Sequence, residues 1–358
     1  MIEQHPIIII GGGLSGLYIA WRLHQRQQNA VVLEARDRCG GRILSPNLGQ
    51  QANSGVDLGP AWLWPQLQPR LGQLLAELDI ELFKQYTTGD ILYESDAWIV
   101  ERYGGQSSHD QSYRIAGGSQ SLINRLTTRL PESALRLNTR VTAISPGSKC
   151  LQATHGDQSL EFTADRIILA LPPRITQKNI TFDPPLPGEI NQLWSSIPTW
   201  MAGHCKLVFT YDLPFWREQN LSGEVFSRCG PLTEIYDGSP ASEEFYALTS
   251  FAGINAQQRM NIGPERLTEL SMDQLKRLFG EKSQNVKDIQ SKDWSQDQHT
   301  ATAHDLNTQG HHPQYPGNMV RNLWDGRLIL AGTEVAREHG GYLEGALESA
   351  DEALALLY

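Results

Sequence analysis

The chain has 358 residues, 40% of them apolar, which is enough to bury one large or two medium hydrophobic cores. Its formal net charge is -10 without any cluster of lysine and arginine, so binding to nucleic acid or to an anionic membrane surface is not expected. The four cysteines show no metal-ligand or disulfide spacing, and no apolar run is long enough for a signal peptide or a membrane helix. We therefore expect a soluble, cytoplasmic protein with free thiols, no metal and no membrane partner, and its oligomeric state is left open.

The first predicted unit is a strand, a glycine-rich turn and a helix. Residues 7–10 are four isoleucines, the composition of a parallel strand that is covered on both faces, and apolar residues at helical spacing follow over 17–24. Between them, Gly11, Gly13 and Gly16 fill the pattern G-x-G-x-x-G. Glycines at these positions permit a tight turn, close approach of a pyrophosphate and packing of the helix on the strand. The free N–H groups at the helix N-terminus favour a phosphate there.

A second predicted strand, AVVLEA, carries a carboxylate where a dinucleotide-binding fold needs one. Glu34 lies about 20 residues after Gly13, and in such folds a carboxylate at this spacing accepts hydrogen bonds from ribose hydroxyls. Strand, spacing and acid together predict a dinucleotide site. NAD and FAD are both still open at this point.

The segment that follows, EARDRCGGR, separates the two cofactors. Its Gly40, Gly41 and Arg42 come directly after the acid, and this arrangement resembles the extended FAD motif of the flavin amine oxidase superfamily, which includes monoamine oxidases, polyamine oxidases and amino-acid oxidases. The resemblance implies that Arg42 neutralises the pyrophosphate while the glycines let the backbone close over it. No second G-x-G-x-x-G follows, which disfavours a reductase with its own NAD domain.

The resemblance extends over nearly the whole chain. GVDLGPAWLWP, residues 55–65, is similar to the segment that passes the flavin ring, and it implies that Trp62 is an active-site aromatic residue. Two further stretches, IAGGSQSLINRL and LRLNTRVTAIS, are similar to the family segments through which the chain returns to the FAD domain. This similarity implies that the backbone of Val141 lies next to adenine. DRIILALPPR resembles the family's apolar strand that ends in a proline pair, where the chain crosses between domains.

The stretch HCKLVFTYDLPFW predicts a strand that carries one ammonium. Alternation places Lys206 with Val208 on one face and Leu207 with Phe209 on the other, so the pattern by itself allows a solvated lysine on a half-exposed strand. The stretch also resembles the family strand whose lysine binds a water at flavin N5. That resemblance implies a buried, catalytic Lys206 whose charge assists flavin reduction or reoxidation by oxygen.

DWSQDQHTATAHDL, from Asp293 to Leu306, departs from the family pattern. In monoamine oxidases the similar segment carries a cysteine linked to the flavin and then a tyrosine of the aromatic cage; counted from Trp294, these positions are Ala303 and His304 here. Ala303 cannot form a thioether, so we expect non-covalent FAD. His304 is predicted to supply half of a cage, or a group that titrates near neutral pH.

The C-terminal stretch GRLILAGTEVAREHGGYLEGALESADEALALLY is similar to the family's last strand, acidic loop and final helix. It implies that Glu334 faces the ribityl or phosphate part of FAD, and that a helix beginning near Tyr342 points its N-terminus at the flavin N1/O2 edge. Tyr342 matches the flavin-facing tyrosine that forms one wall of the amine cage. The alternative is a tyrosine packed in the core at the start of a helix.

The motif and the resemblance assign two sets of site residues and no metal ligand. The catalytic set is Trp62, Lys206, His304 and Tyr342. The FAD-binding set is Gly11, Gly13, Leu14, Ser15, Gly16, Glu34, Ala35, Arg36, Gly41, Arg42, Gly59, Pro60, Ala61, Trp62, Val141, Trp294, Gly332, Glu334, Gly341, Tyr342, Leu343 and Ala346.

The predicted fold class is α/β, with a discontinuous Rossmann-like FAD-binding domain and an interleaved α+β substrate-binding domain built on a mixed sheet. The FAD-binding domain is expected to comprise residues 1–66, 114–173 and 297–358, and the substrate-binding domain residues 67–113 and 174–296. Between the DLGPAW and IAGGS segments the chain has about half the residues that larger family members use for a helical cap. A reduced cap and a more open site are therefore expected.

The leading functional hypothesis is an FAD-dependent amine oxidase that acts on a small-molecule amine. Hydride passes from the amine α-carbon to flavin N5, the imine hydrolyses, and O2 is reduced to H2O2. One alternative is a flavin-dependent dehydrogenase, desaturase or isomerase acting on a non-amine substrate, since the same fold hosts such enzymes. Another is a non-catalytic FAD-bound partner protein. The sequence leaves open which amine is oxidised and whether O2 is the physiological acceptor.

Overall fold

The N-terminal segment forms a strand, a glycine turn and a helix, as the sequence predicts. In the computed structural model, which describes residues 2–105, 107–306, 311–317 and 319–358, β1 spans Ile2–Ile10, α1 spans Leu14–Gln25 and β2 spans Ala30–Leu33. Ile9 packs in a core that includes Leu17 of α1, while Ile8 packs in the core on the opposite face of the sheet. Cover on both faces explains why the isoleucine run is apolar at every position.

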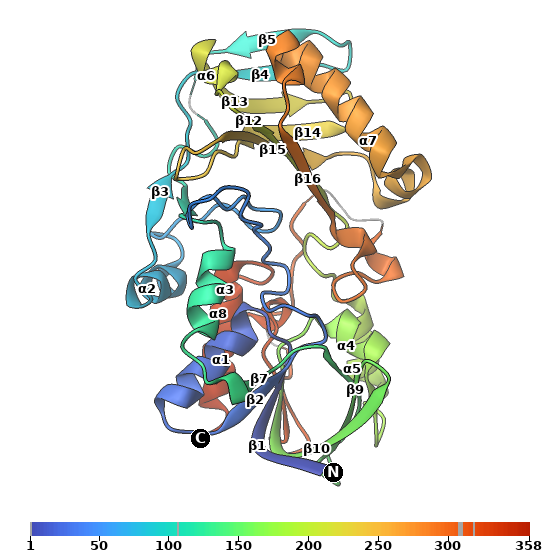
Figure 1. Cartoon of the computed structure of the whole chain (residues 1–358). Helices are drawn as coiled ribbons and strands as arrows, with labels where there is room; N and C mark the ends of the chain where they lie inside the picture. Colours follow the sequence, from blue (N-terminus) through green and yellow to red (C-terminus); the bar gives the residue numbers. More distant parts are fainter. Residues whose placement is uncertain (1, 106, 307–310, 318) are drawn as a thin grey trace.

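Within the described residues, β1 belongs to a nine-stranded sheet with the order β11-β8-β9-β10-β1-β2-β7, in which β18 lies beside β10 and β17 beside β18 (Figure 1). The neighbouring strands β7, β2, β1, β10 and β18 are paired in parallel, which is the arrangement of a Rossmann-like nucleotide-binding sheet. The further strands are β7 (Leu135–Arg136), β8 (Thr139–Ser145), β9 (Cys150–His155), β10 (Gln158–Leu169), β11 (Thr181–Phe182), β17 (Asn322–Leu323) and β18 (Leu328–Leu330).

Helices cover both faces of this sheet (Figure 1). They are α1, α3 (Gln120–Thr127), α4 (Pro173–Asn179), α5 (Gly188–Ser196) and α8 (Leu343–Ala355). α1, α3 and α8 share one core, in which Leu17, Ile123 and Leu347 are fully buried. On the other face, Trp194 of α5 meets Phe182 edge-on at 6.0 Å between ring centroids. No helix in the described ranges combines the length and the apolar composition needed to cross a membrane.

A second sheet, which is mixed, lies beyond the first and is crossed on one face by α7 (Figure 1). Its order is β16-β12-β15-β14-β13-β4-β5, antiparallel except for the parallel pair β13 and β4. Asn255 caps α7 through a reciprocal pair of hydrogen bonds with Gln258. The elements are β4 (Asp90–Glu94), β5 (Val100–Tyr103), β12 (Cys205–Tyr211), α6 (Phe215–Glu218), β13 (Leu221–Ser227), β14 (Leu232–Asp237), β15 (Tyr246–Ala252), α7 (Ala256–Phe279) and β16 (Asp288–Asp293).

The strand β12 is buried on both of its faces. Leu207 and Phe209 lie in the core beneath α7, whereas Val208 packs with Val56 and Leu58 of the segment that links the two sheets. The predicted alternation is therefore confirmed. The half-exposed strand with a solvated Lys206 is wrong, because every residue of Cys205–Tyr211 is buried.

The region between residues 67 and 113 is small, as expected of a reduced helical cap. Its described part contains one helix, α2, together with β4, β5 and the start of a short two-stranded sheet. α2 packs against α8, and Glu344 of α8 accepts the N–H of Leu71 at 2.9 Å. The elements are α2 (Pro69–Glu77), β3 (Leu82–Lys84) and β6 (Tyr113–Ile115).

The division of the chain into two domains stays a prediction. The strands of the smaller sheet come from residues 90–103 and 205–293, which fall within the predicted substrate-binding segments. β11, however, pairs with β8, so residues 181 and 182 lie in the larger sheet although the predicted boundary is at 173. We propose that the chain crosses to the smaller sheet after α5.

Candidate active site

The glycine turn after β1 leaves an open space at the N-terminus of α1. Gly11 has a φ of +108°, and a Cβ there would lie 2.7 Å from the carbonyl oxygen of Ala170. A Cβ on Gly16 would lie 2.0 Å from the oxygen of Gly11, so this glycine allows α1 to pack on its own strand. A Cβ on Gly13 would meet no atom within 4 Å. We propose that a pyrophosphate lies in the space above Gly13.

Glu34 lies directly after β2, at the carboxyl end of the strand. Its Oε2 accepts the N–H of Gly12 at 2.6 Å, and its Oε1 accepts the N–H of Arg36 at 2.8 Å. The residue is only 4% exposed, and it borders the same cavity as the glycine turn. The carboxylate is thus fixed by the backbone, and we propose that it accepts ribose hydroxyls.

A loop far along the chain closes this end of the cavity. Arg36 Nη2 lies 2.6 Å from Asp297 Oδ1 and 2.9 Å from Thr300 Oγ1. Burial opposes the charge of Asp297, but Arg36 and Lys292 outweigh it and lower the pKa of Asp297 to about 2. His299 and Thr300 line the cavity, and sequence reasoning missed both because only the fold brings this loop to the nucleotide end.

Arg42 and Glu334 both line the cavity and contact each other. Arg42 Nη2 lies 2.6 Å from Glu334 Oε1, and Glu334 is fully buried. Neither carboxylate oxygen is in a hydrogen bond of suitable geometry, so the contact is an ion pair that leaves acceptor capacity free. A buried acceptor without a donor costs about 1–3 kcal/mol. The hydroxyl groups of the FAD ribityl chain are donors of the required kind, so these residues fit FAD.

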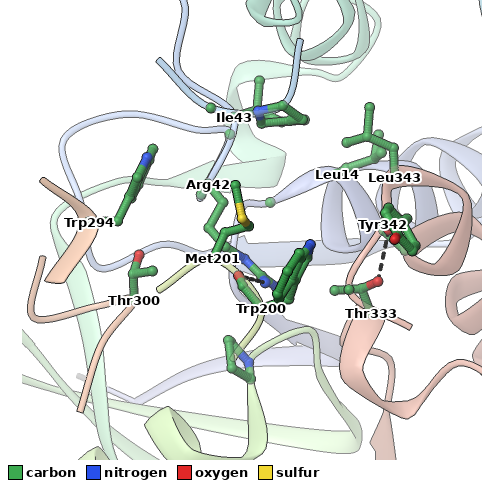
Figure 2. A pocket seen from close by; sticks show the side chains of 18 of the residues that line it. Leu14, Arg42, Ile43, Trp200, Met201, Trp294, Thr300, Thr333, Tyr342 and Leu343 are labelled. Carbon is green, nitrogen blue, oxygen red and sulfur yellow. Dashed lines mark hydrogen bonds between the residues drawn. The ribbon is translucent and has the colours of Figure 1, made fainter. Parts of the chain in front are cut away.

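One pocket joins these groups, and Figure 2 shows part of its lining, including Leu14, Arg42 and Tyr342. Of the predicted residues, its lining includes Gly11, Gly13, Leu14, Ser15, Glu34, Arg36, Gly41, Arg42, Gly59, Pro60, Ala61, Trp62, Lys206, Trp294, Gly332, Glu334, Gly341, Tyr342, Leu343 and Ala346. Four predicted residues lie outside the lining: Gly16, Ala35, Val141 and His304. Gly16 acts through helix packing, and the side chain of Val141 is buried in the core of the larger sheet.

Lys206 reaches this pocket from the second sheet. It is 2% exposed, and its Nζ donates to the carbonyl oxygen of Gly59 at 2.8 Å. The ammonium lies 5.1 Å from the centroid of the Trp62 ring and 5.2 Å from that of Phe251, within cation–π range. Burial lowers the pKa of Lys206 to about 8, and the nearby carboxylate of Asp57 opposes that effect. Lys206 is therefore mainly protonated at neutral pH, although it is surrounded by protein.

An aromatic wall stands beside Lys206. Trp62 donates its indole N–H to Gln85 at 2.9 Å and stacks on His109 at 4.4 Å between centroids, while Tyr236 meets Trp62 edge-on at 4.9 Å. Burial lowers the pKa of His109 to about 4, so this ring is uncharged at neutral pH. Phe251, on the strand next to β12, completes the wall. Sequence reasoning found Trp62 alone, because the others lie outside the motifs: Tyr236 and Phe251 come from the paired strands β14 and β15, and His109 comes from the turn before β6.

Tyr342 stands at the N-cap of α8 and borders the pocket together with Trp200 (Figure 2). Its ring is parallel to that of His312, at 4.6 Å between centroids and 4° between planes. Nε2 of His312 lies 2.8 Å from the carbonyl oxygen of Gly340, which fixes the imidazole. Trp200 meets His312 edge-on at 5.0 Å, and its carbonyl oxygen accepts from Arg42 at 3.2 Å. The sequence motifs included neither Trp200 nor His312.

His304 does not lie beside Tyr342. It is exposed on a short 3₁₀ turn, Ala303–Asp305. The carboxylate of the last residue of this turn is buried; it accepts the N–H of Thr302 at 2.9 Å and pairs with Arg174 at 2.6 Å. Burial of that side chain leaves its neighbour His304 facing solvent. The prediction of His304 as a cage residue is therefore corrected, and the imidazole beside the tyrosine belongs to His312.

A dinucleotide held by the glycine turn and Glu34 would extend toward Lys206 and the aromatic wall, which is how a flavin-dependent oxidoreductase combines cofactor and substrate sites. The family described as "Flavin containing amine oxidoreductase" matches residues 81–354, and "NAD(P)-binding Rossmann-like domain" matches residues 9–78. The chain therefore belongs to the flavin-containing amine oxidoreductase family, as the resemblance predicted. Its cofactor is FAD, and it is an oxidoreductase acting on carbon–nitrogen donors.

Known relatives match along the full length of the chain. It is 23% identical over 456 aligned positions to a probable flavin-containing monoamine oxidase A of Dictyostelium discoideum, covering 98% of this chain and 96% of that protein. It is 24% identical to flavin-containing amine oxidase B of Sus scrofa, covering 99% and 86%. The alignments are longer than the 358 residues of this chain, so the relatives contain insertions that it lacks.

Solved structures of two amine oxidases have the same fold. Wild-type putrescine oxidase bound to putrescine superposes with a TM-score of 0.82 at 20% identity, covering 100% of both chains. Cyclohexylamine oxidase from Brevibacterium oxydans IH-35A superposes with a TM-score of 0.80 at 19% identity, covering 98% of both. At these identities the likeness establishes the fold and leaves the substrate to chemical argument.

Proposed function

We propose that the protein is an FAD-dependent amine oxidase that oxidises a small-molecule amine with O2. Hydride passes from the carbon next to nitrogen to flavin N5, the imine hydrolyses to a carbonyl compound, and O2 is reduced to H2O2. The supporting observation is that Lys206 and Tyr342 line the same pocket as Glu34 and Arg42. The relatives named above are amine oxidases, which supports the same reaction class here.

The substrate end of the pocket favours an uncharged amine. The lining residues there are aromatic or neutral apart from Lys206, and the two carboxylates of the described lining, Glu34 and Glu334, belong to the nucleotide end. His204 also borders this end, and burial, with Arg259 adding to it, lowers its pKa, so it is uncharged near neutral pH. Hydride leaves an amine only when the nitrogen is unprotonated. The tyrosine and tryptophan rings at the pocket wall present aromatic faces against which an uncharged amine packs.

An anaerobic titration tests this proposal. Purified FAD-loaded protein is mixed without oxygen with primary amines, polyamines, amino acids and, separately, non-amine compounds, and then exposed to air. Loss of the oxidised-flavin absorbance with an amine, followed by stoichiometric H2O2 in air, is the expected result. If a non-amine substrate bleaches the flavin and the reduced protein reacts slowly with O2, the dehydrogenase class is correct. If no compound bleaches the flavin, the protein is a non-catalytic FAD-bound protein.

Non-covalent FAD is the first prediction for the loaded enzyme. Ala303 has no sulfur, and none of the four cysteines of the chain lines the described pocket. Acid precipitation is expected to release all the flavin into the supernatant, and the denatured protein is expected to have the mass of the unmodified chain. A yellow pellet, or a protein mass increased by one flavin, contradicts this prediction.

The His312 stack gives a second prediction. His312→Ala removes the ring that supports Tyr342, and stacked aromatic pairs contribute about 0.5–1.5 kcal/mol, so the KM for amines is expected to rise about 2- to 10-fold. The matched control is His311→Ala, at the exposed neighbouring position, which is expected to leave KM unchanged. Equal KM values in the two variants would remove the proposed role of His312.

A further inference from the structure

Three charged side chains are buried together at the lysine end of the pocket. Lys206 is 2% exposed, Asp57 is 3% exposed and Arg114 is 4% exposed. Asp57 and Arg114 do not border the pocket, so the proposed function gives neither of them a role. Arg114 Nη2 lies 3.6 Å from Asp57 Oδ2, and Lys206 is bound by the segment that carries Asp57, so two buried cations and one carboxylate occupy a region where each uncompensated charge is costly.

The carboxylate of Asp57 is held rigidly through one of its oxygens. Oδ1 accepts the hydroxyl of Ser45 at 2.6 Å and the N–H of Ser119 at 2.7 Å. A Cβ on Gly118 would lie 2.5 Å from the Cβ of Ser45 and 3.1 Å from this oxygen, so Gly118 leaves room for the pair of Ser45 and Asp57. Oδ2 has no hydrogen bond and lies 3.6 Å from Arg114 Nη2. One oxygen therefore anchors the group, and the other remains free to balance charge.

The segment that carries Asp57 also contacts the lysine. Gly59, two positions further on, accepts the Lys206 ammonium through its carbonyl oxygen at 2.8 Å. Burial lowers the pKa of Lys206, Asp57 raises it, and Arg114 lowers it further. Arg114 is fixed by a hydrogen bond of 2.8 Å to the carbonyl oxygen of Ser239, so it stays near the carboxylate as a competing cation.

The other charged or titratable groups around the lysine do not replace this carboxylate. They are His109, His204, Glu224, Lys292 and Asp297. His109 and His204 have pKa values lowered by burial, so both are uncharged near neutral pH. Lys292, paired opposite the lysine on β16, is bound to Asp297 at 3.0 Å. Glu224 accepts the hydroxyl of Ser108 at 2.5 Å, and its charge raises the pKa of His109, whereas it is not among the groups that shift the pKa of Lys206.

We propose that Asp57 is a positioning residue for the flavin-facing ammonium: its buried carboxylate is the counter-charge for which Lys206 and Arg114 compete, and it keeps Lys206 protonated near neutral pH. This inference rests on the proposed function for the catalytic meaning of Lys206, and it adds a residue that does not touch substrate or cofactor. It predicts opposite effects for the two buried neighbours, because one attracts the proton on Lys206 and the other repels it.

Titration of Lys206 itself tests the proposal. FAD-loaded protein containing lysine labelled with carbon-13 at Cε is titrated by NMR, and the Lys206 signal is assigned by its absence in Lys206→Met. Asp57→Asn is expected to lower the titration midpoint by about one pH unit or more, and Arg114→Gln to raise it. The pH dependence of the reaction of dithionite-reduced enzyme with O2 is expected to move in the same two directions.

The control is Asp305→Asn, which removes another buried carboxylate, paired with Arg174 at 2.6 Å and not among the groups that shift the pKa of Lys206, and which is expected to leave the midpoint unchanged. If Asp57→Asn does not fold, the upward shift in Arg114→Gln still tests the proposal. Midpoints that stay constant, or that move in the same direction in both variants, overturn it. Failure of the proposed function gives a different result. In that case Lys206→Met leaves the O2 reaction unchanged, while the Lys206 midpoint still shifts in Asp57→Asn and Arg114→Gln.

Discussion

Replacing Lys206 with methionine is expected to slow the reaction of the reduced enzyme with O2 by on the order of 100-fold, the usual loss when one fixed electrostatic group is removed from a reaction centre. Methionine is close to lysine in volume, so the buried strand β12 is expected to remain folded. The measurement is stopped-flow mixing of dithionite-reduced protein with oxygenated buffer, which avoids any dependence on the amine. An unchanged oxygen reaction, together with an unchanged rate of anaerobic flavin reduction by the amine, would return Lys206 to a purely structural role.

The same lysine gives the protein a defined pH dependence. Because burial lowers the pKa of Lys206 to about 8, the ammonium is present below that pH and is lost above it. The oxygen rate is therefore expected to fall as the pH rises through about 8, and Lys206→Met is expected to lack this step. The oxygen rate of the unsubstituted enzyme is measured from about pH 6 to about pH 10, which is about two units on either side of that pKa. A rate that does not change over this range would contradict the assignment of this pH dependence to Lys206.

The free energy of unfolding is expected to change with pH in the opposite direction to the oxygen rate, so it rises as the pH rises. In the unfolded chain a lysine keeps its proton up to about pH 10, so between about pH 8 and 10 the unfolded state binds more protons than the folded state. The free energy of unfolding contributed by Lys206 therefore rises over this interval. Denaturant unfolding at several pH values, compared with Lys206→Met, measures that contribution.

Two alanine substitutions in the glycine turn are expected to separate FAD binding from folding. In Gly16→Ala the new Cβ would lie 2.0 Å from the oxygen of Gly11, so α1 must move away from β1; we expect a loss of about 1–3 kcal/mol in the free energy of unfolding, together with loss of FAD. In Gly13→Ala the Cβ meets no protein atom within 4 Å, and the FAD-free protein is expected to keep its stability within about 0.5 kcal/mol.

The cofactor distinguishes the two variants further. The methyl group of Gly13→Ala occupies the space assigned to the pyrophosphate, so FAD affinity is expected to fall about 10- to 100-fold, or about 1.4–2.8 kcal/mol. Denaturant unfolding of the FAD-free proteins and fluorescence titration with FAD give the two quantities. If Gly13→Ala binds FAD normally, the pyrophosphate does not lie against this turn.

Local spacing in the sequence was sufficient to predict the nucleotide half of the candidate site. The isoleucine run, the glycine pattern and Glu34 depend on contacts within one strand–turn–helix–strand unit, and such contacts leave a direct record in the order of residues. Arg42, Lys206, Glu334 and Tyr342 came from the family resemblance, and all four line one pocket with that unit.

The substrate half depended on tertiary structure. His304 was predicted by counting along the segment after Trp294, but burial of Asp305 beside Arg174 turns His304 to solvent, and no count along the chain reveals that pair. His312, Trp200 and the rings packed around Trp62 meet only because loops and neighbouring strands from distant positions converge there. The charge of Lys206 is likewise decided by groups brought close in space, since a strand pattern specifies a face but not what packs against it.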